Sequence, residues 1–361
     1  MIKIAKPKYY SIESIWKTDS DYHILLGERA NGKSYSAKNK AITRAYNSTD
    51  QKFIYMRRYD SDVKSSLVER YFADVPIEAI SNGKADSIMY YRGQIWAAKT
   101  DPSTLKQTRI KHLGYAIPLN LESRFKSGSY LDVDFILFEE FVSNEGYLPD
   151  EVRKFKSFVS TIARNRKIKV VLIGNTISRI CPYYTAWELY NIPKQEQGTI
   201  DFYYQKYFDT ESNTEQIVKI AVEFCARSGM TGKMFFGESD SMIMTGAWET
   251  PKVPFVSPHT GTIYYTIVVT AMNFKFLAEF KVCENGFAFW YITPKTTAIK
   301  PNTRVVTDKE VFNPYYTKGF RPLNKAESIM FKCFVDDRVF YSSPLCAADF
   351  RNIMKNIRRT F

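Results

Sequence analysis

Short apolar runs and amphipathic stretches alternate through the first half of the chain. The apolar runs lie within residues 22–26, 52–58, 134–138 and 169–174. Runs of this length and composition are typical of strands that are buried on both faces of a parallel sheet. Residues 33–46 and 149–163 carry apolar side chains at helical spacing, and the second stretch has a proline near its first turn. This alternation over residues 20–180 predicts an α/β fold with a mostly parallel sheet.

The segment between the second and third runs has a different pattern. Residues 88–91 and 94–97 flank Arg92 and Gly93, and this arrangement predicts a β-hairpin. Residues 100–112 are polar and basic, and we interpret them as a loop. A short strand is expected at residues 115–118.

The pattern changes again after about residue 195. Residues 195–216 are polar with few aliphatic side chains, and we interpret them as a linker. From about residue 239 strand-like runs dominate, and residues 284–286 predict a hairpin turn between the runs at 276–283 and 287–292. The chain closes with an amphipathic helix at residues 347–358, which we expect to dock on this second sheet.

The first apolar run leads into a glycine-containing loop. Residues 27–34 read GERANGKS and match G-x-x-x-x-G-K-[ST] at every fixed position. Gly27 and Gly32 allow a tight turn in which successive backbone N–H groups point at phosphate oxygens. Lys33 reaches the outer phosphates, and the Ser34 hydroxyl can coordinate Mg²⁺. A helix that starts directly after the loop adds its own preference for anions, so the sequence predicts a nucleoside triphosphate site.

The third apolar run ends in two carboxylates, Glu139 and Glu140. In an NTPase one such carboxylate holds the Mg²⁺ shell and the other orients the attacking water. Neighbouring residues of a strand point to opposite faces, so the two can take different roles. We assign Glu139 to the metal and Glu140 to the water. Asp134 is a weaker metal candidate, because it starts the strand and so lies at the wrong edge of the sheet.

Several polar side chains follow the other predicted elements. Arg164 and Arg166 end the helix at 149–163, where a cation is either a partner of the helix dipole or an arginine finger for a neighbouring subunit. Asn175 ends the next strand, where it is either a sensor of the γ-phosphate or a plain turn residue. Arg57 and Arg58 end the second strand, and a surface pair is as good an interpretation as a functional one.

The net charge, the cysteine spacing and the length of the apolar runs limit which kinds of protein and partner are expected. The 361 residues carry a formal net charge of +13, and such an excess favours a polyanionic partner. The five cysteines are far apart and form no C-x-x-C pair, which argues against a disulfide framework or a zinc site and for a reducing compartment. No apolar run approaches 18 residues, so we expect neither a signal peptide nor a membrane span.

These stretches resemble, in order and spacing, the DNA-packaging ATPase of φ29-type tailed bacteriophages, within the terminase-like packaging motor family. The resemblance is dense over residues 20–190 and weaker but traceable to the end of the chain. The stretches that carry it are residues 27–35, 53–59, 114–119, 136–141, 164–166 and 350–357.

The resemblance implies three domains. Residues 1–197 would form an ASCE P-loop ATPase domain, residues 198–240 a small linker domain, and residues 241–361 an α+β domain similar to an RNase H-like nuclease that has lost its activity. It also implies a homomeric ring, expected to be a pentamer, at the portal (connector) protein of a procapsid in the host cytoplasm. There the ring would hydrolyse ATP with Mg²⁺ and translocate double-stranded DNA, and the resemblance allows a structural packaging RNA as a further partner.

The resemblance also assigns individual residues. Arg29 falls on a phosphate-loop position, as do Lys33 and Ser34. We include Asn31 and Tyr35, inside and directly after the loop, among the residues expected to bind ATP. The remaining matches are Glu140 on the catalytic glutamate, Arg164 on the trans-acting arginine and Asn175 on the polar strand end.

The sequence departs from the family pattern at three places. Glu139 replaces an aspartate and is one methylene longer. Asp60 replaces a basic residue that follows Arg57-Arg58-Tyr59, so no DNA-binding or trans-acting role is carried over there. Residues 100–112 look like an insertion, whose basic side chains face either DNA or solvent.

Three other functions compete with a DNA translocase. A P-loop kinase or regulatory NTPase needs no strongly positive surface. A terminase with nuclease activity needs carboxylates on facing strands to hold metal ions, whereas residues 263–270 carry no Asp or Glu. A passive nucleic-acid-binding module needs no complete phosphate loop.

Overall fold

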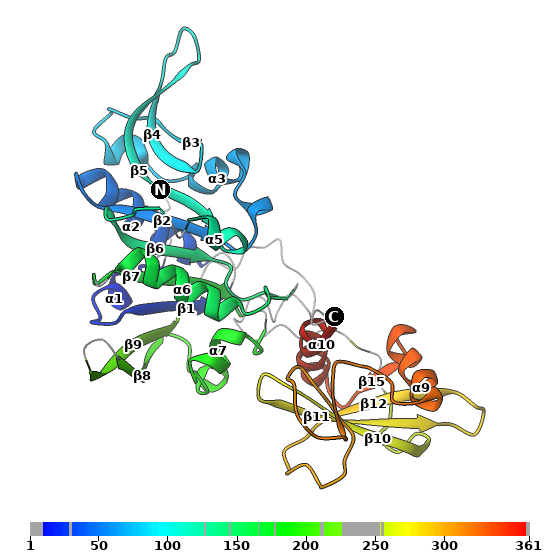
Figure 1. The fold of residues 1–361 in the computed structure, drawn as a ribbon. Coiled ribbons are helices and arrows are strands. Elements are labelled where there is room, and N and C mark those ends of the chain that lie inside the picture. Colours follow the sequence, from blue (N-terminus) through cyan, green and yellow to red (C-terminus); the bar gives the residue numbers. More distant parts are fainter. Residues whose placement is uncertain are drawn as a thin grey trace, which may run out of the picture.

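The computed structural model of the chain describes residues 10–28, 31–125, 128–143, 146–164, 166–176, 178–209, 213–225, 253 and 256–358. These residues form two units, each built on its own sheet (Figure 1). In this part of the chain no helix is both long and apolar enough to cross a membrane.

The first unit contains a nine-stranded sheet with the order β3-β4-β5-β2-β6-β7-β1-β9-β8. Its six central strands are parallel. They are β1 (Tyr22–Gly27), β2 (Lys52–Arg57), β5 (Gln107–Pro118), β6 (Val133–Glu139), β7 (Lys169–Asn175) and β9 (Thr214–Phe224). The antiparallel edge strands are β3 (Ser87–Tyr91), β4 (Gln94–Thr100) and β8 (Thr199–Asp209). The prediction of an α/β fold with a mostly parallel sheet is therefore confirmed.

Helices cover both faces of this sheet, which explains why β1, β2, β6 and β7 are mostly apolar. One face packs against α1 (Glu13–Trp16), α2 (Lys33–Asn47), α3 (Ser65–Phe72) and α4 (Ile77–Ile80). The other packs against α5 (Glu122–Phe125), α6 (Glu151–Ala163) and α7 (Pro182–Ala186). Three 3₁₀ turns lie in the connections, at Asp60–Asp62, Leu119–Leu121 and Ile192–Lys194. The carboxyl ends of the parallel strands meet at one edge, where ligands bind in such sheets.

Two expectations about polar segments are wrong. Residues 195–216 are not a linker, because they include β8 and the start of β9, which pairs in parallel with β1. Residues 100–112 are not a loop throughout: only residues 101–106 lie outside strands, and from Gln107 on β5 continues the hairpin with β4. Both segments carry polar side chains because their strands extend into solvent. The division of the chain at residues 197 and 240 stays a prediction, and residues 226–240 lie outside the described residues.

The second unit contains a six-stranded sheet with the order β14-β13-β10-β11-β12-β15. Its strands are β10 (Thr262–Ala271), β11 (Phe274–Val282), β12 (Ala288–Pro294), β13 (Val305–Thr307), β14 (Tyr316–Lys318) and β15 (Val339–Tyr341). Two helices, α9 (Lys325–Val335) and α10 (Pro344–Arg358), pack on it. Phe350 and Ile353 of α10 are buried, as expected for a docked amphipathic helix.

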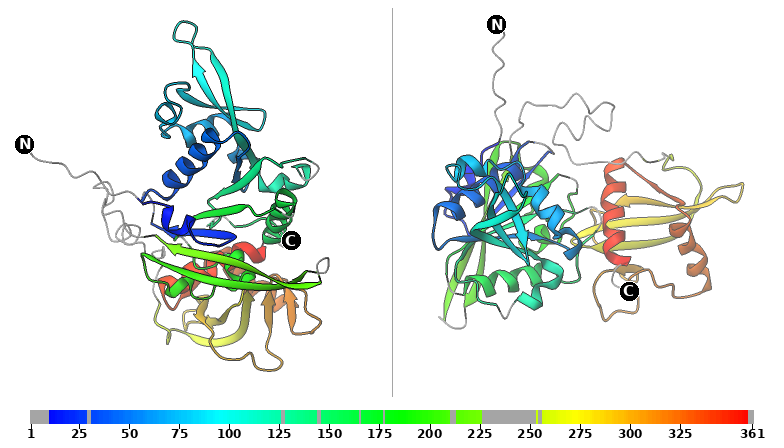
Figure 2. Two further views of the ribbon diagram at one scale, coloured as in Figure 1. Left: turned by 90° about the vertical axis from the view of Figure 1, so that its left-hand side faces the viewer. Right: turned by 90° about the horizontal axis from the view of Figure 1, so that it is seen from above.

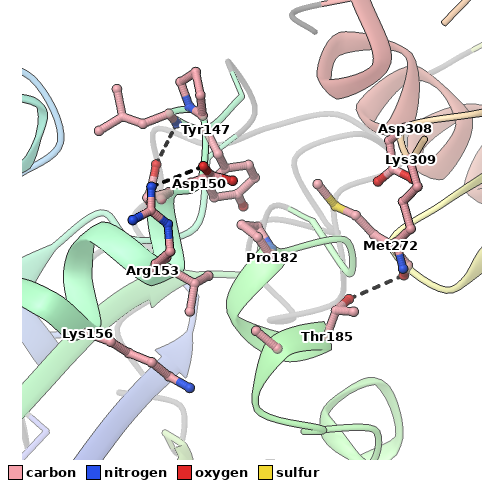
Figure 3. A pocket seen from close by; sticks show the side chains of 14 residues that line it. Tyr147, Asp150, Arg153, Lys156, Pro182, Thr185, Met272, Asp308 and Lys309 are labelled. Carbon is pink, nitrogen blue, oxygen red and sulfur yellow. Dashed lines mark hydrogen bonds and ion pairs between the residues drawn. The ribbon is translucent and has the colours of Figure 1, made fainter. Parts of the chain in front are cut away.

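The segment that follows β7 joins the two units. The Arg179 guanidinium lies 2.5 Å from the Asp349 carboxylate of α10, and the Asn352 amide donates to the Ser178 hydroxyl. Ile180 is buried in the core of the second unit. Beside this junction, a cavity of about 630 Å³ lies between α6, α7 and the turn at Met272 (Figure 3). The right-hand view of Figure 2 shows the two units side by side.

Candidate functional site

The phosphate-loop lysine is anchored at the carboxyl edge of the first sheet. Gly32 has φ +96°, a left-handed conformation that glycine adopts without strain, and α2 starts at the next residue. The Lys33 Nζ is 2.6 Å from the Glu28 carbonyl oxygen, 3.2 Å from Asn31 Oδ1 and 3.4 Å from Asn175 Oδ1. The structure thus brings Asn175 to the loop, as the sequence predicts. Arg29 lies outside the described residues.

Lys33 is only 4% exposed, and burial lowers the pKa of its ammonium group. Nearby Cys225, Glu139 and Glu28 raise the same pKa and oppose this effect. A buried ammonium is stable only with acceptors around it, and phosphate oxygens are acceptors of this kind.

A cavity of about 320 Å³ opens beside this lysine. The buried Asn31 amide nitrogen has no hydrogen-bond partner among the described residues. The amide of Asn31, the ammonium of Lys33 and the hydroxyl of Ser34 are thus hydrogen-bond donors among the lining residues, which suits a polyphosphate. The lining residues are Asn31, Gly32, Lys33, Ser34, Tyr35, Lys38, Asp74 and Asn175.

Glu139, at the end of β6, lies in the interior beside Ser34, which lines this cavity. It is 4% exposed, and the Tyr71 hydroxyl donates to its Oε1 over 2.5 Å. Burial raises the pKa of Glu139, and hydrogen bonds from Tyr71 and Ser34 oppose the rise. A carboxylate beside the phosphate-loop serine is an oxygen ligand of the kind that Mg²⁺ prefers.

Glu140 points the other way. Its side chain is 60% exposed and lies 2.6 Å from the Arg57 guanidinium. The backbone at Glu140 has φ +56°, because the chain turns sharply where β6 ends. The two glutamates thus face different surroundings, and the roles assigned to them stay a prediction.

A buried ion pair supports the turn at Glu140. Arg58 and Glu151 are paired through two hydrogen bonds of 2.8 and 3.0 Å, with exposed side-chain fractions of 6% and 0%. The Arg58 guanidinium also donates to the carbonyl oxygens of Glu140 and Phe141. Arg58 is therefore buried and stabilises the turn at Glu140, and it is not half of a surface pair.

Replacing Glu151 by alanine is expected to lower the free energy of unfolding by about 3–5 kcal/mol, since Arg58 would remain buried without its carboxylate. Urea unfolding followed by circular dichroism measures the change. The matched control is Glu215→Ala, which removes the carboxylate of an exposed pair with Lys206 and should change the free energy by less than about 1 kcal/mol. Equal effects of the two substitutions would contradict the bracing role.

Arg164 lies at the opposite edge of the sheet from the phosphate loop. It ends α6, which runs back from the carboxyl edge, and its guanidinium donates to the Gly128 carbonyl. Arg166 is bound to four backbone carbonyls, those of Tyr130, Leu131, Val133 and Ile162. Asp134 is paired with Arg44 at the same edge. The structure does not bring Arg164 to the site of its own chain.

Sequence reasoning missed Tyr71 and Lys38. Tyr71 lies on α3, 68 residues before Glu139 in the sequence. The two meet only because that helix packs against the sheet. Lys38 lines the cavity and lies 2.5 Å from Asp74. Neither residue belongs to a local motif, so no pattern in the sequence marks them.

Comparisons with known proteins agree with this architecture. A protein-family model described as podovirus DNA encapsidation protein (Gp16) matches residues 4–201, more than half of the chain. The DNA packaging protein of Bacillus phage phi29 is 29% identical over 188 residues. This match covers 51% of each protein, so the alignment spans about half the length of that relative. The family resemblance drawn from the sequence motifs is confirmed.

Two solved structures share the fold over almost the whole chain. The bacteriophage Phi-29 viral genome packaging motor assembly contains a chain that is 21% identical, with a TM-score of 0.54 over 97% of this chain and 98% of that one. The Phi-28 gp11 DNA packaging motor is 16% identical, with a TM-score of 0.52 over 98% and 99%. At these identities the likeness concerns the fold.

Proposed function

The chain belongs to the podovirus DNA encapsidation protein (Gp16) family, and from this premise we propose that it is an ATP-driven motor that translocates double-stranded viral DNA into a procapsid. The observation that carries the proposal is the convergence of Lys33, Ser34, Glu139 and Asn175 at the carboxyl edge of one parallel sheet. This arrangement suits hydrolysis of a nucleoside triphosphate, with the net charge of +13 available for a polyanion.

The donor set of the cavity fits ATP and Mg²⁺. Lys33, Asn31 and the start of α2 would hold the phosphates, together with Arg29, Gly27, Gly32 and Tyr35 of the same loop. Ser34 and Glu139 would hold Mg²⁺, whose chemistry when bound is to neutralise charge on the phosphate oxygens. Asn175 would sense the γ-phosphate through its place beside the Lys33 ammonium.

In this proposal Glu140 orients the attacking water and accepts its proton. Its exposed carboxylate is held by Arg57, outside the buried environment of Glu139. Arg164 would act in the site of a neighbouring copy, because α6 carries it to the far edge of its own sheet. A ring of copies, proposed to be a pentamer, would place each Arg164 at the next site.

The remaining parts of the proposal concern partners and the second unit. The ring would sit at the portal protein of the procapsid in the host cytoplasm, with a structural packaging RNA as a further partner. We propose that residues 241–361 form an RNase H-like domain without nuclease activity. Its mixed sheet with flanking helices supports the fold, and the absence of Asp and Glu from β10 supports the loss of cleavage.

Replacing Tyr71 by phenylalanine is expected to move the acid limb of ATP hydrolysis to higher pH. The hydrogen bond from Tyr71 lowers the Glu139 pKa, so its loss lets burial raise that pKa further. A proton then competes with Mg²⁺ at a higher pH, and activity disappears earlier as the pH falls. A hydrogen bond to a charged group is worth about 1.5–3 kcal/mol, which corresponds to roughly 1–2 pH units.

Rate profiles across pH at one fixed, sub-saturating Mg²⁺ concentration measure this shift. Tyr22→Phe is the control, because Tyr22 starts β1 at the opposite edge of the sheet. Superimposable acid limbs for wild type and Tyr71→Phe would contradict the assignment of Glu139 to the metal.

The proposed function is tested by DNA packaging itself. Procapsids with their portal, linear double-stranded DNA and this protein are mixed with ATP, and nuclease-resistant DNA is measured. Protection should require ATP and should be absent with a non-hydrolysable analogue. Protection that is equal with both nucleotides, or absent with ATP, would count against a motor.

A further inference from the structure

A two-stranded arm extends from the first sheet at the amino end of β5. The phosphate loop lies at the other edge, where the parallel strands have their carboxyl ends. The arm consists of residues 94–112, that is β4, the turn after it and the first half of β5. Before Gly114, from Gln107 on, β5 pairs with β4 alone, and it pairs with β2 only from Gly114 to Pro118. Residues 101–110 are all exposed. Figure 1 shows this hairpin projecting from the body of the sheet. Isolated two-stranded hairpins are only marginally stable, so an arm of this length needs internal support.

Cross-strand rings provide that support. Trp96 and His112 are directly opposite each other with ring centroids 4.7 Å apart, and Tyr115 packs edge-on against His112 at 4.8 Å. In the turn, the Asp101 carboxylate accepts from the backbone N–H groups of Ser103 and Thr104. The arm therefore holds its shape without being covered by another element.

The arm and the turn before it carry an excess of positive charge. Residues 92–112 contain five basic residues and one acidic residue, Asp101, whose carboxylate is used inside the turn. Lys99 faces Asp86, and Lys111 donates to a backbone carbonyl. The other three, Arg92, Lys106 and Arg109, have no carboxylate partner in the part of the chain that the structure describes.

Two of these arginines are held on aromatic rings. The Arg109 guanidinium lies 4.7 Å from the Tyr91 ring and 5.2 Å from the Trp96 ring, and the Arg92 guanidinium lies 5.2 Å from the Tyr91 ring. Stacking fixes a guanidinium by its face and leaves the N–H groups at its rim free for an anion. Arg92, Arg109 and Tyr91 are all exposed on this strand surface. We call Tyr91, Arg92, Trp96 and Arg109 the arginine–aromatic face.

We propose that the arginine–aromatic face, with Lys106 near the tip of the arm, binds the phosphate backbone of double-stranded DNA. Pre-positioned guanidinium groups bind phosphates through paired N–H donors, and such contacts track a duplex without reading its sequence. A motor that moves along any sequence needs contacts of this kind. The inference rests on the proposed function, since it names the surface that the DNA of that function meets.

The experiment measures binding of a short fluorescent DNA duplex by anisotropy, at several salt concentrations and with a non-hydrolysable ATP analogue. The variant is Arg92→Gln with Arg109→Gln. The control is Lys99→Gln with Lys206→Gln, which removes the same charge from two lysines that already face carboxylates. We expect the slope of log affinity against log salt to fall by about 2 in the variant only, since each phosphate contact contributes about 0.9. ATP hydrolysis without DNA should be the same in all three proteins.

Two results would overturn the inference while leaving the proposed function intact. The wild type could respond to DNA and the variant could match the control in affinity and slope. Alternatively, the variant could lose assembly in sedimentation but keep its DNA contacts when assembled, in which case the face meets a second copy of the chain. A wild type whose ATP hydrolysis and anisotropy are both insensitive to DNA would instead contradict the proposed function.

Discussion

Replacing Glu140 by glutamine is expected to slow ATP hydrolysis by about 10²–10⁴-fold, the usual contribution of a positioned general base. ATP binding should change by less than about threefold, because Glu140 lies outside the buried cluster of Lys33, Asn31 and Asn175. Glutamine keeps the length of the side chain and its contact with Arg57 but cannot accept the proton of the attacking water. Single-turnover hydrolysis and binding of a fluorescent ATP analogue measure the two effects separately.

Glu139→Gln is the matched control, one residue away and with the same loss of charge. It should weaken Mg²⁺-dependent nucleotide binding, since Glu139 is the buried carboxylate beside Ser34. If Glu139→Gln abolishes hydrolysis while binding is kept, and Glu140→Gln keeps more than about a tenth of the wild-type rate, the two roles are exchanged and our assignment is wrong.

Replacing Arg164 by alanine is expected to slow hydrolysis by about 10³–10⁵-fold, the range known for arginine fingers. The physical reason is geometric. Helix α6 has 13 residues and is therefore about 20 Å long, and it places Arg164 at the amino edge of the sheet while the phosphate loop lies at the carboxyl edge. In the proposed ring the side chain would therefore serve the site of another copy.

Mixing the two inactive variants tests this arrangement. Where an Arg164→Ala subunit supplies the site and its Glu140→Gln neighbour supplies the arginine, the interface is complete, so mixed rings should regain part of the activity. Arg166→Ala is the control, since Arg166 is held by backbone carbonyls and its loss should lower stability without being rescued by mixing. No recovery in verified mixed rings would exclude action in trans.

The elements of the central sheet were predictable because their signals are local. β1, β2, β6 and β7 are apolar runs, and α2 follows directly from the phosphate loop. β8 was not predicted, because its exposed face carries aromatic and charged side chains and the segment therefore lacks an apolar run. These side chains include Phe202, Tyr204 and Lys206. Its neighbour β9 reaches β1 across almost 200 residues, and no local pattern encodes such a pairing.

The same distinction applies to the site. Lys33, Ser34 and the glutamate pair belong to continuous motifs, so the sequence predicted their meeting at one edge of the sheet. The hydrogen bond from Tyr71 to Glu139 and the ion pair between Arg58 and Glu151 join segments 68 and 93 residues apart. Both depend on the packing of helices on the sheet, which becomes visible only in three dimensions.

The steady-state rate of ATP hydrolysis with and without double-stranded DNA, with procapsids present in both cases, tests directly whether the chain is a DNA motor. We expect strong stimulation of the wild type by DNA, because the proposed motor couples nucleotide turnover at Lys33 and Glu140 to movement on the duplex. A rate that is substantial but indifferent to DNA would contradict it, and would favour a P-loop kinase or regulatory NTPase that acts on a small molecule.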